Sequence, residues 1–165
     1  MSPRAAWRLE TLGFTRVYHY AAGKADWAAY GLPVEGEVTK SARLKDIART
    51  DVPTCSLDDT VLIARRRAGD WETCVVVDER GVVFGRMFKK ELDGDPNARV
   101  GDVMRPGTST FRPNVSTREM LDYMDRREHE TSLVTTPDGR LVGLVLREDL
   151  ERAATPTSCC SQIGR

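Results

Sequence analysis

The chain has 165 residues, of which 40% are apolar and 30% charged, a balance that supports a hydrophobic core and argues against wholesale disorder. Its 25 basic and 25 acidic residues cancel, so no strong field is expected to draw the protein to nucleic acid or anionic lipid. No apolar run approaches the roughly 18 residues that a membrane helix needs, and the amino terminus lacks the apolar core of a signal peptide.

The segment 1–38 is expected to form a helix, a strand and a second helix. Apolar side chains recur at helical spacing through Pro3–Gly13, which ends in a glycine. Phe14–Tyr20 is rich in aromatic and β-branched residues, as strands are. A second helix is expected to start within Ala22–Trp27 and to end within Tyr30–Val34.

The order of these features resembles the C-terminal half of a rhodanese domain: a first helix, a Gly-Phe strand start, a Gly-x-x-x-Trp helix and a Gly-Leu-Pro-Val end. Enzymes of that family carry a persulfide on a cysteine in the loop before the first of these helices. No cysteine precedes Cys55, so the resemblance implies a remnant without a catalytic residue. Two explanations stay open: a cap left after loss of the front half, or a longer natural product that holds the cysteine.

The rest of the chain contains an internal repeat. Leu44–Arg49 corresponds to Val100–Arg105 at an offset of 56 residues. Asp78–Gly85 corresponds to Thr136–Gly143 at an offset of 58 residues. The second copy therefore has about two extra residues, which we expect near Arg112–Asn114.

Each copy is expected to run strand, helix, strand, strand, helix. In the first copy the expected segments are a short strand at Pro53–Cys55, a helix through Val61–Ala64, a strand at Cys74–Val77, a turn at Gly81 into Val82–Phe84, and a helix from Lys89. In the second copy they are Ser109–Phe111, a helix capped by Ser116 or Thr117, Ser132–Val134, a turn at Gly139 into Leu141–Val142, and a helix from Arg147. One copy of about 50 residues is too small to bury its own sheet, so the two are expected to pack face to face.

The two copies, in this order, resemble a pair of CBS domains, also called a Bateman module. The resemblance rests on three features of each copy: the Asp-Ile/Val-(Ala/Met)-Arg opening, the strand–glycine turn–strand hairpin and the closing Glu-Leu or Asp-Leu. It implies an α/β (α+β) fold in which two β-α-β-β-α repeats are related by a pseudo-two-fold axis. Residues 42–95 then form the first repeat and residues 96–154 the second, followed by a disordered tail at 155–165.

CBS pairs generally bind adenosine-containing ligands between their repeats, so the resemblance implies AMP, ATP or S-adenosylmethionine as a regulatory ligand. The implied ligand-binding residues are Asp149, Gly143, Thr110, Val134, Glu91 and Gly85. Asp149 matches the carboxylate that takes the ribose hydroxyls in the family, and Glu91 holds that place in the first copy. Both acids also suit the first turn of a helix, where the helix dipole stabilises a negatively charged side chain. A structural role therefore stays open for Asp149 and is favoured for Glu91.

The closing strands depart from the family pattern, in which a Ser or Thr hydroxyl contacts phosphate. Leu146 and Phe88 stand at that position in the two copies. A phosphate would lose a hydrogen-bond donor at each place. These departures weaken the case for a nucleotide and point to a nucleoside-like ligand or to none.

The remaining polar and reactive side chains are given structural interpretations. The thiols of Cys55, Cys74, Cys159 and Cys160 fit no disulfide framework and are expected to be free, as in the cytoplasm. His19 is expected to be partly buried and His129 solvated, with no metal site. Arg65–Arg67 is expected on a solvated helix face, and Trp71 is expected to pack against neighbouring residues.

The sequence therefore predicts a non-catalytic, cytoplasmic regulatory module that senses an adenosine-type ligand. It is expected to form a homodimer through the CBS repeats and to act on an unknown effector protein, without nucleic acid or membrane. Two alternatives stay open. One is a rhodanese-type sulfurtransferase completed by upstream sequence or by another chain, and the other is a structural interaction module that binds no ligand.

Overall fold

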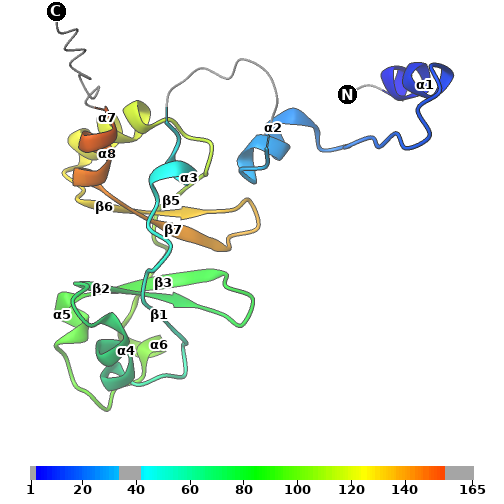
Figure 1. Cartoon of the computed structure of the whole chain (residues 1–165). Helices are drawn as coiled ribbons and strands as arrows, with labels where there is room; N and C mark the ends of the chain where they lie inside the picture. The colour runs from blue at the N-terminus through cyan, green and yellow to red at the C-terminus, as the bar shows by residue number, and fades with distance from the viewer. Residues whose placement is uncertain (1–2, 34–41, 155–165) are drawn as a thin grey trace, which may run out of the picture.

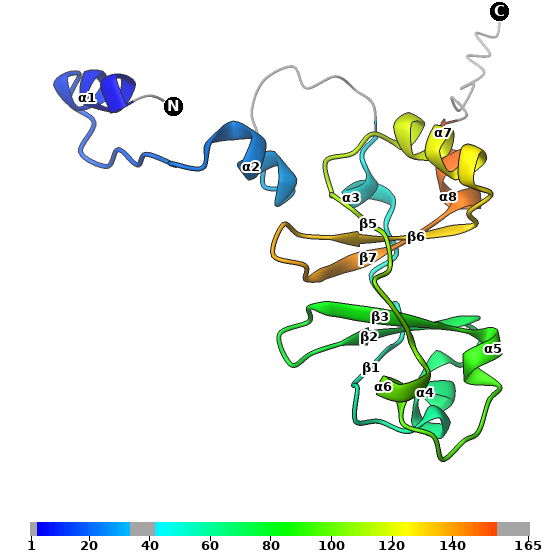
Figure 2. The same cartoon turned by 180° about the vertical axis from the view of Figure 1, so that it is seen from behind.

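Two β-sheets stack face to face, and helices cover the outer face of each (Figure 1). This computed structural model describes residues 3–33 and 42–154. The view from behind in Figure 2 shows the same four layers, with a separate N-terminal extension that contains the helices α1 and α2. The α/β architecture predicted from the sequence is confirmed.

The first repeat forms a four-stranded sheet in the order β1-β2-β3-β4. Its elements are β1 (Thr54–Cys55), α4 (Val61–Ala68), β2 (Thr73–Val77), β3 (Val83–Phe88) and α5 (Lys89–Leu92), with β4 (Arg105–Pro106) added at the edge. β1 runs parallel to β2, whereas β3 is antiparallel to both of its neighbours. The predicted order of elements is confirmed, and β4 is an addition that the repeat pattern did not reveal.

The second repeat forms a three-stranded sheet in the order β5-β6-β7. Its elements are β5 (Thr110–Phe111), α7 (Thr117–Arg127), β6 (Thr131–Thr135), β7 (Leu141–Leu146) and α8 (Arg147–Ala154). Ser116 caps α7 as expected, because its side-chain oxygen accepts the N–H of Glu119. Gly81 and Gly139 turn the two hairpins with φ of +79° and +84°, a conformation that glycine adopts without strain.

The two extra residues of the second copy do not lie near Arg112–Asn114, so that prediction is wrong. The offset between the copies is still 56 residues from β1 to β5 and from α4 to α7, and it becomes 58 only from β2 to β6. The insertion therefore lies at the C-terminal end of α7, which is 11 residues long where α4 has 8. A helix accommodates added residues at its exposed end without disturbing the sheet.

The two repeats exchange their leading segments. α3 (Leu44–Ile47) begins the first copy, yet the fully buried Leu44 packs with Met120, Val145 and other core residues of the second. α6 (Val100–Val103) begins the second copy, yet Val100 packs in the core of the first. Neither repeat thus completes its core from its own sequence, which explains physically why the two fold as one unit.

A third cluster joins the inner faces of the two sheets. Val75 from β2 meets Leu133 and Leu144 from β6 and β7, and all three are fully buried. Val52 and the half-buried Trp71 pack against this cluster. The apolar contact between the sheets therefore stabilises the packing of the two repeats against each other.

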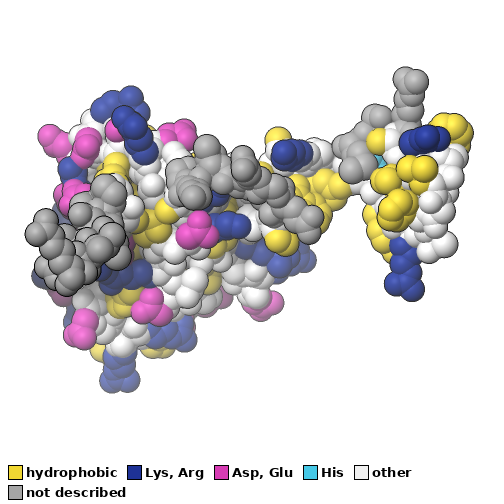
Figure 3. All heavy atoms as spheres, turned by 45° about the horizontal axis from the view of Figure 1, so that its top comes forward, with side chains coloured by type: hydrophobic (Ala, Val, Ile, Leu, Met, Phe, Trp, Pro, Cys, Tyr) yellow, Lys and Arg dark blue, Asp and Glu magenta, His cyan; other side chains and the backbone are white. Residues whose placement is uncertain are grey.

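The N-terminal extension contains α1 (Pro3–Thr11) and α2 (Gly23–Ala29), as predicted, but the strand expected over Phe14–Tyr20 is absent. A strand needs a partner for its backbone N–H and C=O groups, and no described segment pairs with these residues. Their aromatic side chains are largely exposed, and Tyr18 is 84% exposed. Hydrophobic side chains accordingly show on the surface of the extension in Figure 3.

His19 is exposed, so its predicted partial burial is also wrong, for the same lack of a packed sheet. The extension contacts the body near Gly31, whose carbonyl accepts a hydrogen bond from Lys45 Nζ over 3.1 Å. The assignment of residues 1–38 to a rhodanese-like remnant stays a prediction, as do the domain boundaries. The tail 155–165, with Cys159 and Cys160, lies outside the described residues.

Candidate functional site

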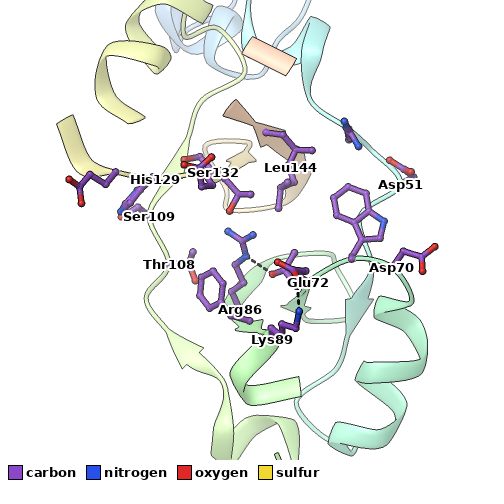
Figure 4. Close-up of a pocket in the computed structure, with 18 residues that line it drawn as sticks. Asp51, Asp70, Glu72, Arg86, Lys89, Thr108, Ser109, His129, Ser132 and Leu144 are labelled. Carbon is purple, nitrogen blue, oxygen red and sulfur yellow. Dashed lines mark hydrogen bonds and ion pairs between the residues drawn. The ribbon is translucent and has the colours of Figure 1, made fainter. Parts of the chain in front are cut away.

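A cleft of about 790 Å³ opens between the two repeats, at one end of the contact between the sheets (Figure 4). We call it the inter-repeat cleft. It is lined by Arg49, Asp51, Asp70, Trp71, Glu72, Thr73, Arg86, Phe88, Lys89, Thr108, Ser109, Glu128, His129, Glu130, Thr131, Ser132, Leu144 and Leu146. Its size is within the usual range of roughly 300–1,000 Å³ for small-molecule sites.

Most lining residues come in pairs that hold the same place in the two repeats, 58 residues apart. The pairs are Asp70 with Glu128, Trp71 with His129, Glu72 with Glu130, Thr73 with Thr131, Arg86 with Leu144, and Phe88 with Leu146. The inter-repeat cleft therefore lies on the pseudo-two-fold axis that relates the two repeats. The pairs differ in chemistry, so the two halves of the cleft are not equivalent.

Arg86 is the charged group that lies deepest in the cleft. Its side chain is 3% exposed, and its Nε donates to Thr73 Oγ1 over 2.6 Å. Thr73 Oγ1 in turn donates to the carbonyl of Met87 over 2.9 Å. The guanidinium carbon lies 4.6 Å from the ring centroid of Phe88. Burial lowers the pKa of Arg86 to about 10, which still leaves the group protonated at neutral pH.

The side walls of the cleft combine an indole ring with ion pairs. The guanidinium of Arg49 lies 5.9 Å from the ring centroid of Trp71, within the range of a cation–π contact. At the opening, Lys89 Nζ lies 2.8 Å from Glu72 Oε1. This hydrogen bond from Lys89 holds the pKa of the Glu72 carboxyl below its usual value.

Within the described residues, none of the six residues predicted from the sequence lines the inter-repeat cleft. Asp149 lies behind its wall, since Arg49 lines the cleft and binds Asp149 Oδ2 through Nε at 2.7 Å and Oδ1 through Nη2 at 3.1 Å. A second arginine, Arg152, also donates to Asp149. The hydrogen bond from Arg49 holds the pKa of Asp149 below its usual range, against the opposite effect of burial.

Glu91 occupies the matching place in the first repeat. Its Oε2 accepts the backbone N–H of Phe88 over 3.0 Å, and its Oε1 lies 2.8 Å from Arg105 Nη2. Burial alone would raise the pKa of Glu91, but the hydrogen bonds from Arg105 and the Phe88 backbone outweigh it and lower the pKa. Asp149 and Glu91 each therefore bind an arginine from an exchanged leading segment.

Gly85 and Gly143 allow those segments to approach closely. A Cβ on Gly143 would lie 2.5 Å from the carbonyl oxygen of Arg49, and a Cβ on Gly85 would lie 2.6 Å from that of Arg105. Both distances are too short for any side chain. The two glycines thus have a packing role that their place in the repeat explains.

Thr110 and Val134 lie on neighbouring strands of the second sheet and do not share a site with the acids. Thr110 is exposed on β5 and pairs with Leu133. Val134 is fully buried in the core of the second repeat, where it packs beside Leu44 and Met120. Of the six predicted residues, two are therefore acids bound to arginines, two are glycines at which another segment crosses closely, and two lie on strands of the second sheet.

Sequence reasoning missed Arg86 and the position of Trp71. The closing pattern has an apolar residue after its glycine, as in Gly143-Leu144, whereas the first copy has Gly85-Arg86. An arginine at a position that faces the opposite sheet was the available signal. Trp71 does pack against the core between the sheets, as expected, and one side of it also lines the cleft.

The thiols of Cys55 and Cys74 are buried in the first repeat, as predicted for core residues. The hydrogen bond to Cys55 and the burial raise the pKa of Cys74, which makes its thiolate scarce. Among the described residues, no three His, Cys, Asp or Glu side chains gather as a metal site would require. None of the helices described is both long enough and apolar enough to span a bilayer.

Comparisons with known proteins fit this architecture. Residues 100–155 match a family model described as CBS domain. The crystal structure of the CBS domain pair of protein MJ0100, in complex with 5'-methylthioadenosine and S-adenosyl-L-methionine, superposes with a TM-score of 0.59, covering 68% of this chain and 94% of that one at 18% identity. The fold is that of a CBS domain pair. The crystal structure of CBSX2 in complex with AMP also superposes on this chain, with a TM-score of 0.61 and 18% identity over 68% of this chain and 96% of the other.

A curated relative of this chain is the magnesium transporter MgtE of Thermus thermophilus, which is 30% identical over 99 residues, or 58% of this chain and 22% of the transporter. The crystal structure of the cytosolic domain of the Mg²⁺ channel MgtE in complex with ATP gives a TM-score of 0.61 at 24% identity, covering 67% of this chain and 48% of that one. The chain thus spans less than half of either MgtE sequence.

Proposed function

We propose that this CBS pair is a non-catalytic regulatory module that binds an adenosine-containing ligand in the inter-repeat cleft. The cleft itself is the observation that supports this proposal most strongly. It lies between the repeats, has a volume of about 790 Å³ and combines apolar with hydrogen-bonding walls. Proteins of the same fold were solved with ATP, with AMP, and with 5'-methylthioadenosine and S-adenosyl-L-methionine.

In this proposal Trp71 binds the adenine base. Its indole ring is half-buried and packs at the edge of the core between the sheets, which fixes its position. The lining residues Phe88, Leu144 and Leu146 supply further apolar surface. Stacking of a base on an aromatic side chain is worth about 1–3 kcal/mol in proteins that bind single-stranded nucleic acid, and an ordered tryptophan loses little entropy on binding.

Regulation would follow from a shift between two packings of the repeats. A ligand in the cleft contacts residues of both sheets, so it binds best to one relative orientation of the repeats. Its differential affinity for that orientation is what moves the population. The module is proposed to act in the cytoplasm as a homodimer that presents this difference to an effector protein.

Ribose binding by Asp149 remains a prediction within this proposal. The carboxylate is held by Arg49, which lines the cleft. A ribose reaches Asp149 only if Arg49 swings away from it. An Asp149→Asn variant that retains full affinity would remove this residue from the site and leave the proposed ligand unchanged.

Isothermal titration with AMP, ATP and S-adenosylmethionine tests the proposed function. We expect at least one of the three to bind the native chain, and a Trp71→Leu variant to bind that ligand about tenfold more weakly. A Trp7→Leu variant is the matched control, because Trp7 is 62% exposed on α1 and remote from the cleft. Absence of heat with all three ligands at millimolar concentration would reject the proposal.

A further inference from the structure

Arg86 lies where the repeat pattern places an apolar residue. Its counterpart in the second repeat is Leu144, which is fully buried in the contact between the sheets. Figure 4 shows the guanidinium of Arg86 pointing from the first sheet into the cleft, toward Ser132 and Leu144. A charge thus replaces a hydrophobic side chain on a surface that otherwise holds the repeats together.

Within the part of the chain that the structure describes, no carboxylate forms an ion pair with Arg86. The described interactions of the Arg86 side chain are the hydrogen bond from Nε to Thr73 and the contact with the Phe88 ring. The two terminal nitrogens of the guanidinium have no hydrogen-bond partner among residues 3–33 and 42–154. These nitrogens are not sealed from solvent, because none of the described residues has a fully buried side-chain nitrogen or oxygen without a partner. A largely buried charge without a carboxylate still costs free energy, so folding alone gives no reason to keep it.

Hydroxyl groups surround the same part of the cleft. Ser132 is 5% exposed and Thr131 precedes it on β6, and neither hydroxyl has a hydrogen-bond partner among the described residues. Thr108 and Ser109 line the adjacent wall. These side chains can replace the hydroxyl that both closing strands lack. A guanidinium with hydroxyl donors beside it is suited to bind phosphate.

The opening of the cleft has the opposite charge. Exposed carboxylates there belong to Asp51, Asp70, Glu72, Glu128 and Glu130. The other two cations of the lining are already paired, Arg49 with Asp149 and Lys89 with Glu72. A second or third phosphate would extend from Arg86 toward these carboxylates and be repelled. The arrangement favours a ligand with a single phosphate.

We infer that Arg86 is an anion-binding residue that makes the cleft selective for a nucleoside monophosphate. The inference rests on the proposed function for the nucleoside part and on Arg86 for the phosphate part. It distinguishes AMP from adenosine, which lacks the anion, and from ATP, whose outer phosphates face the acidic opening.

The test is titration of the native chain and of Arg86→Met with adenosine, AMP and ATP in magnesium-free buffer. Thermal unfolding is measured in inorganic phosphate and in sodium chloride of equal ionic strength. We expect the native chain to bind AMP about 10- to 100-fold more tightly than adenosine. ATP should bind more weakly than AMP. Arg86→Met should bind AMP and adenosine alike, and phosphate should raise the unfolding temperature only where Arg86 is present.

Two further variants keep the inference open to refutation. Arg66→Met removes an exposed arginine of α4 and should behave as the native chain does. Arg86→Lys keeps the charge and should retain part of the AMP preference, even if Arg86→Met fails to fold. Without ligand, Arg86→Met should unfold at the native temperature or above it, because it removes an unbalanced buried charge.

The outcomes separate the inference from the proposed function. Equal binding of adenosine and AMP by the native chain overturns the inference and supports the adenosine site. Stabilisation by phosphate that depends on Arg86, without binding of any nucleoside, supports the anion site and rejects the adenosine site. Native AMP affinity in Arg86→Met, or equal stabilisation of both proteins by phosphate, overturns the role of Arg86.

Discussion

The two repeats have the same fold, but their side chains differ on the inner faces of the sheets. In each, a glycine makes room for a crossing segment, and an acid binds the arginine of that segment: Gly143 with Asp149 and Arg49, Gly85 with Glu91 and Arg105. These parts are symmetric. The inner faces are not, because Arg86 and Trp71 of the first repeat face Leu144 and His129 of the second. The symmetric residues hold the leading segments in place, and the asymmetric ones make the two walls of the cleft differ.

We expect the largest effect from a variant that has an arginine at the Arg86 position in both repeats. Leu144→Arg would place a second unbalanced charge in the apolar contact between the sheets. We expect a loss of about 3 kcal/mol or more in the free energy of unfolding, measured by urea denaturation. The reverse change, Arg86→Leu, should cost less than about 1 kcal/mol or stabilise the chain. Equal losses in the two variants would contradict the asymmetry.

Two glycine variants test the symmetric part of the comparison. Gly143→Ala and Gly85→Ala would each press a Cβ against a carbonyl oxygen, at 2.5 and 2.6 Å before relaxation. We expect each to lose about 2 kcal/mol in the free energy of unfolding. Because the distances nearly match, the two losses should agree closely in urea denaturation. An unchanged free energy of unfolding for either variant would show that the crossing segment of that repeat is not tightly packed against the glycine.

Trp71 and His129 hold the same place on opposite sides of the cleft, so their variants measure which side holds the base. His129→Leu should change the affinity for the adenosine-type ligand less than threefold, against the tenfold loss expected for Trp71→Leu. Isothermal titration measures both. A larger loss in His129→Leu would move the base to the second repeat.

The smallest expected effect is the pH dependence of the acid–arginine pairs. The pKa of Asp149 is lowered in the folded protein, so its stabilising contribution is full above the unfolded pKa of about 3.9. It is lost as pH falls through the folded value. Asp149→Asn should cost roughly 1 kcal/mol at pH 7, since Arg49 is partly exposed. Its stability should also fall less steeply than the native one below pH 4.

Glu91→Gln provides the comparison in the other repeat, because the pKa of Glu91 is also lowered. Its stability should depend on acid pH in the same sense as that of Asp149→Asn. Urea midpoints at pH 7, 4 and 3 measure both variants. Steeper acid unfolding in either variant than in the native chain would contradict the assigned direction of the pKa shift.

The repeat pattern predicted the fold well because it is local. Alternating apolar segments, the cap at Ser116 and the glycine turns at Gly81 and Gly139 each determine their own element. The exchange of α3 and α6 was not predictable in this way, since Leu44 and Val100 read as apolar wherever they pack. The strand expected over Phe14–Tyr20 failed for the opposite reason: it had the composition of a strand but no partner.

The six site residues stay a prediction, because residues matched to a family pattern need not line the inter-repeat cleft. Asp149 was correctly placed at the start of α8, but only coordinates reveal that Arg49 separates it from the cleft. Arg86 was readable in the sequence as a charge in an apolar position. Its role in binding an anion is the inference that the titrations of Arg86→Met test.

The most direct test of the account is a crystal structure of the chain grown with saturating AMP. We predict the nucleotide in the inter-repeat cleft, with its base against Trp71 and its phosphate within hydrogen-bonding distance of the Arg86 guanidinium. An empty cleft at saturating AMP, or a nucleotide bound elsewhere on the chain, would contradict the account.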